Sequence, residues 1–272
     1  MKFNLKIIST VLTTACLFAQ SNAIATSLDA ALKAQTRSEN NIQRDVYRHP
    51  KQTLAFFDIS PEQTVVEIWP GAGWYSEILA PYLHDKGTYY AAHFPAQTQS
   101  GFFQKSRAQF QQKLKTNPAY EKVIITEFEP ASASEIAPAN SADLVLTFRN
   151  LHNWYIGGSD EAAISAFKTF YKALKPGGVL GVVDHQMPEN LDQNANKKSG
   201  YVKMSQAISW ALQAGFILEA SSEVNANEKD SAEHPKGVWT LPPSLRLGDE
   251  DKQTYLAIGE SDRFTLKFRK PK

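Results

Sequence analysis

The chain has 272 residues, of which 42% are hydrophobic, and its 29 Lys and Arg residues against 28 Asp and Glu residues give a formal net charge of +1 at pH 7. This balance argues against recognition of nucleic acid or of an acidic membrane through overall charge. A single cysteine, Cys16, excludes an internal disulfide framework, so an apolar core must hold the fold together.

The N-terminus is typical of a secretory signal peptide. Lys2 and Lys6 precede an apolar stretch over 7–19, and small residues follow as far as Ala23. We expect cleavage near Ala23, export to the bacterial periplasm, and a mature chain over 24–272 that forms one domain with an N-terminal helical arm. An uncleaved anchor helix is a weaker alternative, because the stretch is shorter than the ~20 residues that span a bilayer. Attachment of lipid at Cys16 is a second alternative.

Strands and helices are predicted to alternate after the arm. Short β-branched or apolar runs predict strands, and apolar residues at helical spacing predict the helices between them. The expected strands cover 64–69, 88–93, 123–128, 144–148 and 179–183, and the expected helices cover 74–84, 100–115 and 160–174. This alternation is typical of an α/β fold with a doubly wound parallel sheet.

The order changes in the last quarter of the chain. A helix over 201–214, a strand over 216–224 and a last strand over 263–268 predict a final antiparallel pair at the sheet edge. The polar segment 225–261 between these strands is longer than an ordinary connection. We expect it to be either a cover over a functional site or a mobile loop.

The most informative motif is the bend Val-Val-Glu-Ile-Trp-Pro-Gly-Ala-Gly-Trp-Tyr over 65–75. Gly71 and Gly73 permit a sharp turn and the close approach of a ligand. The helix that follows presents unpaired N–H groups at its start. The motif therefore predicts a small-ligand site with Glu67 beside it, although a plain tight turn, with Glu67 capping the helix, is the structural alternative.

Polar and aromatic residues gather where the predicted strands end. In an open parallel sheet, ligands bind beyond the carboxyl ends of the strands. The residues at these ends are Trp69 in the first strand, His93 in the second, Glu127 and Glu129 in or after the third, Arg149, Asn150 and His152 after the fourth, and Asp184 and His185 after the fifth. One edge of the sheet is thus the expected site, with core packing of Trp69, a loop role for His93 and a solvated charge at Arg149 as alternatives.

Three stretches together resemble the class I S-adenosylmethionine-dependent methyltransferases. They are VVEIWPGAGWYSEILAPYL, ADLVLTFRNLHNW and LKPGGVLGVVDH. More narrowly, the chain is similar to an exported bacterial group of predicted methyltransferases. The resemblance implies a Rossmann-like, doubly wound sheet of seven strands in the order 3-2-1-4-5-7-6, with an antiparallel last strand and helices on both faces. It also implies S-adenosylmethionine as cofactor.

The resemblance assigns cofactor contacts residue by residue. Glu67 matches the acidic residue that holds the methionine ammonium group, and Gly71 and Gly73 match glycines that let the backbone approach the cofactor. Trp69 replaces a glycine, and His93 replaces the acidic residue that binds the ribose hydroxyls. Glu127, or Glu129, is a candidate for the adenine amino group, and Arg149 and Asn150 complete the expected cofactor set.

His152, His185 and Asp184 are the candidate catalytic residues. They follow neighbouring strands, and an imidazole is a suitable general base near neutral pH. We expect no metal shared by His93, His152 and His185, because the second and fifth strands are three strand spacings apart, about 14 Å. His152, Asp184 and His185 alone remain a weaker metal alternative.

Two functions therefore compete. The first is methyl transfer from S-adenosylmethionine to an unidentified small-molecule acceptor, whose site we expect among the loops 94–104, 150–160 and 186–200. The second is a catalytically degenerate protein of this fold that binds a small ligand in the exported compartment. The second is motivated by Trp69 and His93, and by the synthesis of S-adenosylmethionine inside cells.

Overall fold

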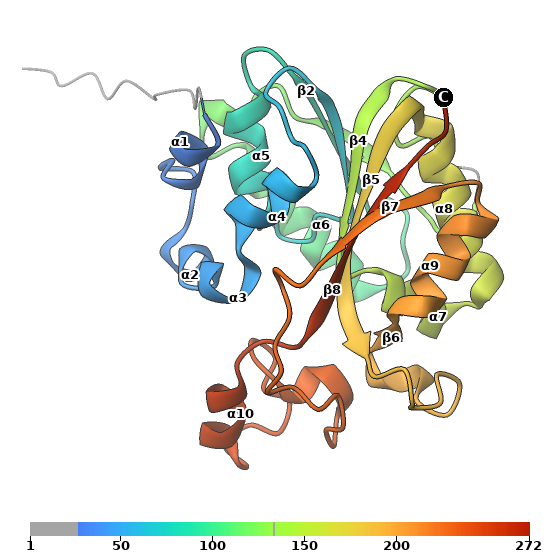
Figure 1. Ribbon diagram of the computed structural model, residues 1–272. Helices are drawn as coiled ribbons and strands as arrows, with labels where there is room; N and C mark the ends of the chain where they lie inside the picture. The colour runs from blue at the N-terminus through green and yellow to red at the C-terminus, as the bar shows by residue number, and fades with distance from the viewer. Residues whose placement is uncertain (1–26, 133) are drawn as a thin grey trace, which may run out of the picture.

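A mixed β-sheet forms the centre of the molecule. The computed structural model describes residues 27–132 and 134–272, so the predicted signal peptide lies outside the described residues. Figure 1 shows the sheet running through the molecule with helices on both sides. The strands are β1 (Thr64–Ile68), β2 (Thr88–His93), β3 (Ile124–Glu127), β4 (Ala142–Phe148), β5 (Leu174–Met187), β6 (Val202–Lys203), β7 (Ile217–Ser222) and β8 (Arg263–Arg269).

The strand order is β3-β2-β1-β4-β5-β8-β7, and β6 pairs with the end of β5. β1 to β5 are parallel to one another, whereas β8 lies between β5 and β7 and runs antiparallel to both. The predicted order 3-2-1-4-5-7-6 is confirmed, because the unpredicted two-residue β6 only shifts the numbers of the last two strands. All parallel strands therefore end at the same edge, as the site prediction requires.

Helices cover both faces of the sheet. The α-helices are α1 (Leu28–Leu32), α2 (Glu39–Ile42), α3 (Asp45–Arg48), α4 (Pro50–Phe56), α5 (Ser76–Leu83), α6 (Gly101–Leu114), α7 (Leu151–Gly157), α8 (Asp160–Ala173), α9 (Met204–Gln213) and α10 (Lys252–Ile258). The short 3-10 helices are η1 (Pro118–Tyr120), η2 (Lys197–Ser199) and η3 (Gly237–Thr240). One apolar cluster packs α7, α8 and α9 on one face, and a second packs α1, α4, α5 and α6 on the other (Figure 1).

Three local predictions were wrong. The segment 150–160, expected as a loop, contains α7, whose first turn is fixed by hydrogen bonds to Asp184. β5 is longer than predicted at both ends, since Leu174 pairs with Ala142 and Met187 pairs with Lys203. The helix expected from residue 201 begins at Met204, because Val202 and Lys203 join the sheet as β6.

The segment 225–261 is an anchored cover. The Asn225 side chain donates to Thr53 at 3.0 Å and to Thr265 at 2.9 Å, and Asn227 donates to the backbone of Ile258 and Glu260. Figure 1 shows the segment beyond the end of the sheet toward which β5 points. Of the two alternatives, the cover therefore describes this segment, and it lies at the edge where the site is expected.

No helix within residues 27–132 and 134–272 has the length and apolar character needed to cross a membrane.

We predict that Gly181→Ala destabilises the fold, because Gly181 lies in β5 where a Cβ would lie 2.8 Å from Phe57 and from Leu146. Both neighbours are fully buried, so we expect a loss of about 1–3 kcal/mol in unfolding free energy, measured by chemical denaturation. Gly101→Ala is the matched control, since a Cβ there meets nothing within 4 Å. Equal stability of the two variants would contradict this packing.

Candidate functional site

A cavity of about 520 Å³ lies at the carboxyl ends of β1, β4 and β5. The arm before β1 and the cover segment close it from the other side, through residues such as Arg48, Trp239 and Pro242. Seven of the predicted site residues line it: Glu67, Trp69, Gly71, Arg149, Asn150, His152 and His185. The sheet edge thus does bring residues from distant parts of the sequence together.

The bend after β1 has an unusual backbone. Trp69 adopts a φ of +47°, and Gly71 and Gly73 adopt +60° and +85°. A bulky residue at positive φ is strained and persists only when its surroundings hold it there. The Trp69 indole is held by Phe94, Phe103, Phe128 and Trp154, with ring centroids 4.8–5.9 Å away, and its Nε1 donates to the Phe128 carbonyl at 3.0 Å. We call these five residues the aromatic cluster.

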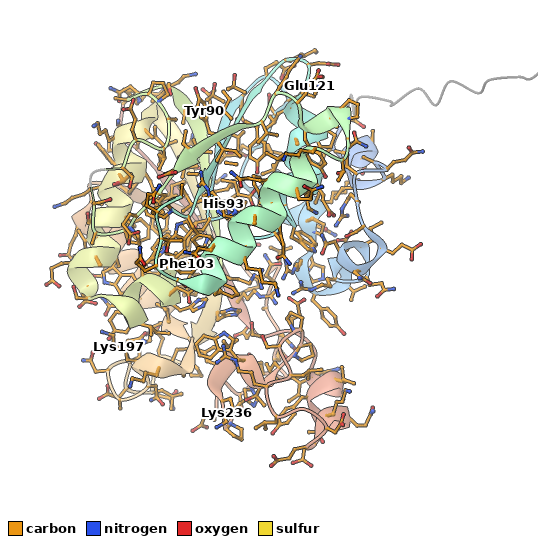
Figure 2. All side chains as sticks on the ribbon, turned by 180° about the vertical axis from the view of Figure 1, so that it is seen from behind. Tyr90, His93, Phe103, Glu121, Lys197 and Lys236 are labelled. Atoms are coloured by element: carbon orange, nitrogen blue, oxygen red, sulfur yellow. The ribbon has the colours of Figure 1, made fainter. Side chains whose placement is uncertain are left out.

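His93 is hydrogen-bonded to this bend and does not line the cavity. Its Nδ1 accepts from the Phe94 backbone at 2.8 Å, so the ring proton is assigned to Nε2, which donates to the Gly71 carbonyl at 3.0 Å. Burial, partly offset by the bond to Gly71, lowers the pKa of His93 to about 4, so the ring is neutral. Figure 2 shows His93 beside α6, the helix that carries Phe103. With both nitrogens used and no place in the cavity lining, the expected ribose contact is not available.

Two other expected cofactor residues also lie outside the cavity lining. The Glu127 carboxylate accepts from the Ala96 backbone at 3.1 Å and pairs with Arg107 at 3.1 Å, so it does not reach a ligand there. Gly73 faces α6 instead: a Cβ at this position would lie 3.1 Å from the ring of Phe110. Packing against α6 and the positive φ therefore explain why position 73 is a glycine, without a ligand contact.

Glu67 lines the cavity but is hydrogen-bonded within the protein. Its carboxylate accepts from Ser76 Oγ at 2.9 Å and from the Tyr89 hydroxyl. Burial, opposed by these two bonds, raises the pKa of Glu67 to about 7. The bonds go to side chains, so Glu67 does not cap the backbone of the following helix.

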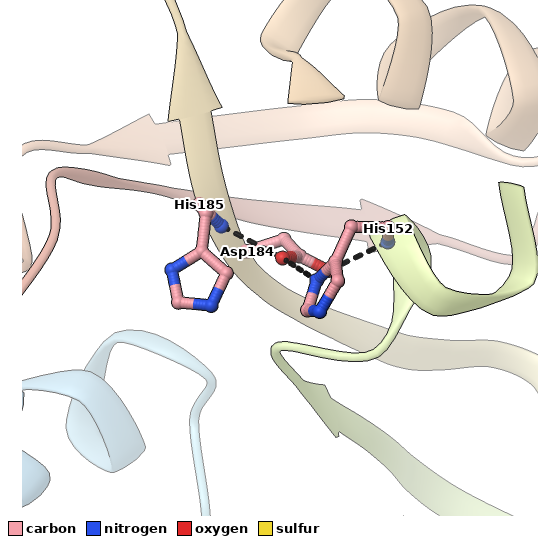
Figure 3. Close-up of side chains that lie close together, drawn as sticks. All are labelled: His152, Asp184 and His185. Atoms are coloured by element: carbon pink, nitrogen blue, oxygen red, sulfur yellow. Dashed lines mark hydrogen bonds and ion pairs between the residues drawn. The ribbon is translucent and has the colours of Figure 1, made fainter. Parts of the chain in front are cut away.

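His152, Asp184 and His185 form a hydrogen-bonded group at the ends of β4 and β5 (Figure 3). The Asp184 carboxylate is fully buried and accepts from the backbone of Leu151 at 2.6 Å and of His185 at 2.7 Å. It also accepts from Nδ1 of His152 at 2.8 Å. This bond assigns the proton to Nδ1 and leaves a lone pair on Nε2, which has no protein partner among the described residues.

His185 differs from His152 in its hydrogen-bond partner. Its Nδ1 contacts the hydroxyl of Ser261, which belongs to the cover segment, and its ring lies 5.0 Å from that of His152. Burial, followed by the neighbouring His152, Arg263 and Arg149, holds the pKa of His185 well below its usual range. Of the two histidines, His152 is therefore the better placed base.

The same three residues could provide metal ligands. One atom from each lies within 4.8 Å of the others, so the three side chains are close enough to be candidate ligands. Asp184 already accepts several N–H bonds, and a metal would compete with them. The geometry therefore fits a histidine oriented by a carboxylate better than a metal centre.

Five arginines line the cavity, and the sequence pointed to only one of them, Arg149. One of the five, Arg246 in the cover segment, lies over the Trp239 ring. Arg44 and Arg48 come from the arm, Arg149 from the end of β4, and Arg263 from the start of β8; all line the cavity together with Glu260. Arg149 is not the solvated surface charge that was one alternative, because it is half-buried. The arm arginines gave no signal, since sequence spacing does not show that the arm folds back onto the strand ends.

Comparison with solved structures identifies the fold. A S-adenosylmethionine-dependent methyltransferase from Aquifex aeolicus is similar with a TM-score of 0.55 and 14% identity, covering 84% of this chain and 93% of that one. Another from Methanosarcina mazei has a TM-score of 0.53 and 11% identity, covering 80% and 96%. The chain has the methyltransferase fold. No family model matches it, and no curated protein is similar enough to add a relative.

The methyltransferase fold does not fix the reaction. The [4+2]-cyclase SpnF is also similar, with a TM-score of 0.54 and 16% identity over 84% of this chain and 82% of that one. These identities establish the architecture alone, so the chemistry must be argued from the site.

S-adenosylmethionine fits this cavity at one end only. Glu67, Gly71 and Asn150 are present for the methionine end. At the nucleoside end, His93 is hydrogen-bonded to Gly71 and Glu127 is paired with Arg107, so neither expected contact is free. The aromatic cluster fills the space beyond the ends of β1, β2 and β3.

We predict that Glu67 makes stability depend on pH. The folded protein keeps the Glu67 proton up to about pH 7, whereas the unfolded chain loses it near pH 4.5. This contribution is therefore complete below pH 4.5 and is lost as the pH rises to 7. Relative to Glu67→Gln, the wild type should lose about 3 kcal/mol of unfolding free energy between pH 4 and pH 8. If the unfolding free energies of the two proteins changed in parallel with pH, the raised pKa of Glu67 would be contradicted.

Proposed function

We propose that the protein transfers a methyl group from S-adenosylmethionine to a small-molecule acceptor with a hydroxyl or amine group. The observation that carries this proposal is the His152–Asp184 pair, which offers an oriented, unpaired imidazole nitrogen beside the Gly71 bend of a methyltransferase fold. S-adenosylmethionine, when bound, would supply an electrophilic methyl carbon. The part left to the protein is to orient the acceptor and remove its proton.

Each residue of the pair has a separate task. Asp184 holds His152 in the tautomer that presents a lone pair on Nε2, and the backbone N–H groups of Leu151 and His185 keep that carboxylate in place. His152 accepts the acceptor's proton at Nε2 and becomes an imidazolium that Asp184 stabilises. His185, whose low pKa keeps it neutral, can accept or donate one hydrogen bond to position the acceptor.

Removal of the base should affect catalysis much more than cofactor binding. We expect His152→Ala to lower turnover by about 10²–10⁴-fold and Asp184→Asn to lower it as well through the wrong tautomer, with S-adenosylmethionine affinity unchanged. The readout is S-adenosylhomocysteine formed from S-adenosylmethionine and a small-molecule extract of bacterial periplasm. His84→Ala, at a histidine outside the cavity lining, is the control. Full turnover in His152→Ala would exclude the base role.

A second candidate is a ligand-binding protein that does not use S-adenosylmethionine. The specific observation in its favour is the aromatic cluster, in which the Trp69 indole occupies the nucleoside end and bonds the Phe128 carbonyl. The similarity to the cyclase SpnF is compatible with other uses of this architecture.

Titration with S-adenosylmethionine separates the two candidates. The methyl-transfer proposal expects calorimetric binding to wild-type protein. The ligand-binding alternative expects none in the wild type and recovery in Trp69→Gly, which restores a glycine at a position of positive φ. Trp69→Phe, which keeps an aromatic ring, serves as control, and thermal unfolding checks that both variants fold.

We also propose that the chain is exported and acts as one domain over 24–272. The basic, apolar and small-residue pattern up to Ala23 supports this. N-terminal sequencing of protein recovered from a periplasmic extract tests it.

A further inference from the structure

Three arginines of the cavity pair with one carboxylate. Glu260 lies 2.6 Å from Nε of Arg44 and 3.3 Å from Nε of Arg48, and it also pairs with Arg263. Arg149 makes no ion pair or side-chain hydrogen bond within residues 27–132 and 134–272. The guanidinium groups of four arginines thus lie in the cavity lining with a single acidic side chain, Glu260. We call Arg44, Arg48, Arg149 and Arg263 the arginine wall.

Several guanidinium N–H groups of the arginine wall lack acceptors. Nη2 of Arg44, Nη2 of Arg48 and Nε of Arg263 are buried without a partner in the described part of the chain. Arg48 and Arg263 are each only 3% exposed. Buried charged donors without acceptors are costly, so such an arrangement indicates that an acceptor from outside the chain completes it.

The other carboxylates of the cavity region cannot compensate this charge. Glu67 is bonded to Ser76 and Tyr89, and its raised pKa makes it partly neutral. Asp184 is committed to the backbone of α7 and to His152. Glu260 is already ionised, because the arginines overcome the effect of burial and hold its pKa well below its usual range.

The Arg149 guanidinium group keeps its charge at neutral pH. Burial, with Glu260 opposing it and Arg263 and Arg44 reinforcing it, lowers the pKa of Arg149 only to about 10. Arg149 therefore remains a cation that faces the cavity wall without a compensating carboxylate of its own.

We infer that the arginine wall binds a carboxylate or phosphate group of the small molecule that occupies the cavity, so the ligand is an anion. The statement that this anion is the methyl acceptor rests on the proposed function. The statement that the cavity binds an anion also holds for the ligand-binding alternative. Planar guanidinium groups from three directions match the lone pairs of an oxyanion. The arginine wall lies close enough to His185 to depress its pKa, so an anion held there would place the rest of the ligand near His152.

Charge favours the second molecule over the carboxylate of S-adenosylmethionine as the partner. The four arginines of the arginine wall exceed Glu260 by three charges. The cofactor offers one carboxylate while carrying a sulfonium and an ammonium group. The cofactor alone would therefore leave the cavity strongly cationic, whereas an anionic acceptor would reduce the repulsion.

The test is calorimetric titration of the chain over 24–272 with inorganic phosphate and, separately, with benzoate, at constant ionic strength in chloride. We expect saturable binding of at least one anion, weakened about tenfold or more in Arg149→Gln and in Arg44→Gln. Arg149→Lys keeps the charge and should lose less. Arg269→Gln, which changes an arginine paired with Glu219 outside the cavity lining, should not change the affinity. If Arg149→Gln does not fold, the test rests on Arg44→Gln, because the Arg44 side chain is 24% exposed and its replacement disturbs the core less.

The outcomes separate the two proposals. Phosphate binding alone indicates a phosphorylated ligand, and benzoate binding alone indicates a carboxylate. Failure of both anions to bind, with and without S-adenosylmethionine, overturns the inference, as does an equal loss in Arg269→Gln. Competition between anion and S-adenosylmethionine, with weaker cofactor binding in Arg149→Gln, also overturns it, because the arginine wall would then serve the cofactor. Anion binding without any cofactor binding leaves the site standing and rejects methyl transfer.

Discussion

The buried carboxylate of Asp184 is the interaction on which the candidate site depends. It lies at the end of β5 and accepts backbone N–H groups from the first turn of α7 and from its own strand, as well as the His152 ring. A buried carboxylate is tolerated only when its lone pairs are satisfied. Here that requirement also determines where α7 begins and how His152 is oriented, so the same bonds serve the fold and the site.

A second constraint acts at the end of β1. His93 holds the Gly71 carbonyl from below, and the aromatic cluster holds Trp69 in a backbone conformation that a bulky side chain rarely adopts. Both residues depart from what the methyltransferase resemblance expects, and they do so together in space. Hydrogen bonds from His93 and from Trp69 therefore hold the bend. The arginine wall lines the cavity on the side where the arm and the cover segment meet.

Most of the fold could be predicted from the sequence. The alternation of strands and helices predicted a parallel sheet with helices between its strands, and the resemblance of three stretches to methyltransferases implied the strand order. The predicted part of the candidate site comes from the carboxyl ends of strands: Glu67 lies near the end of β1, Asp184 and His185 lie near the end of β5, and His152 follows β4. The roles of His93 and Glu127 could not be read from position, since their hydrogen bonds to Gly71 and Arg107 depend on how α6 packs. Arg44, Arg48 and Glu260 were missed because only the folded arm and cover bring them together.

The Glu260 ion pairs join segments that are 216 and 212 residues apart in the sequence. Synthesis and any secretion proceed from the N-terminus, so Arg44 and Arg48 emerge long before the carboxylate that organises them. The pocket can then assemble only after nearly the whole polypeptide is available. A chain exported unfolded would carry no ligand with it and would have to collect its small molecule at its destination.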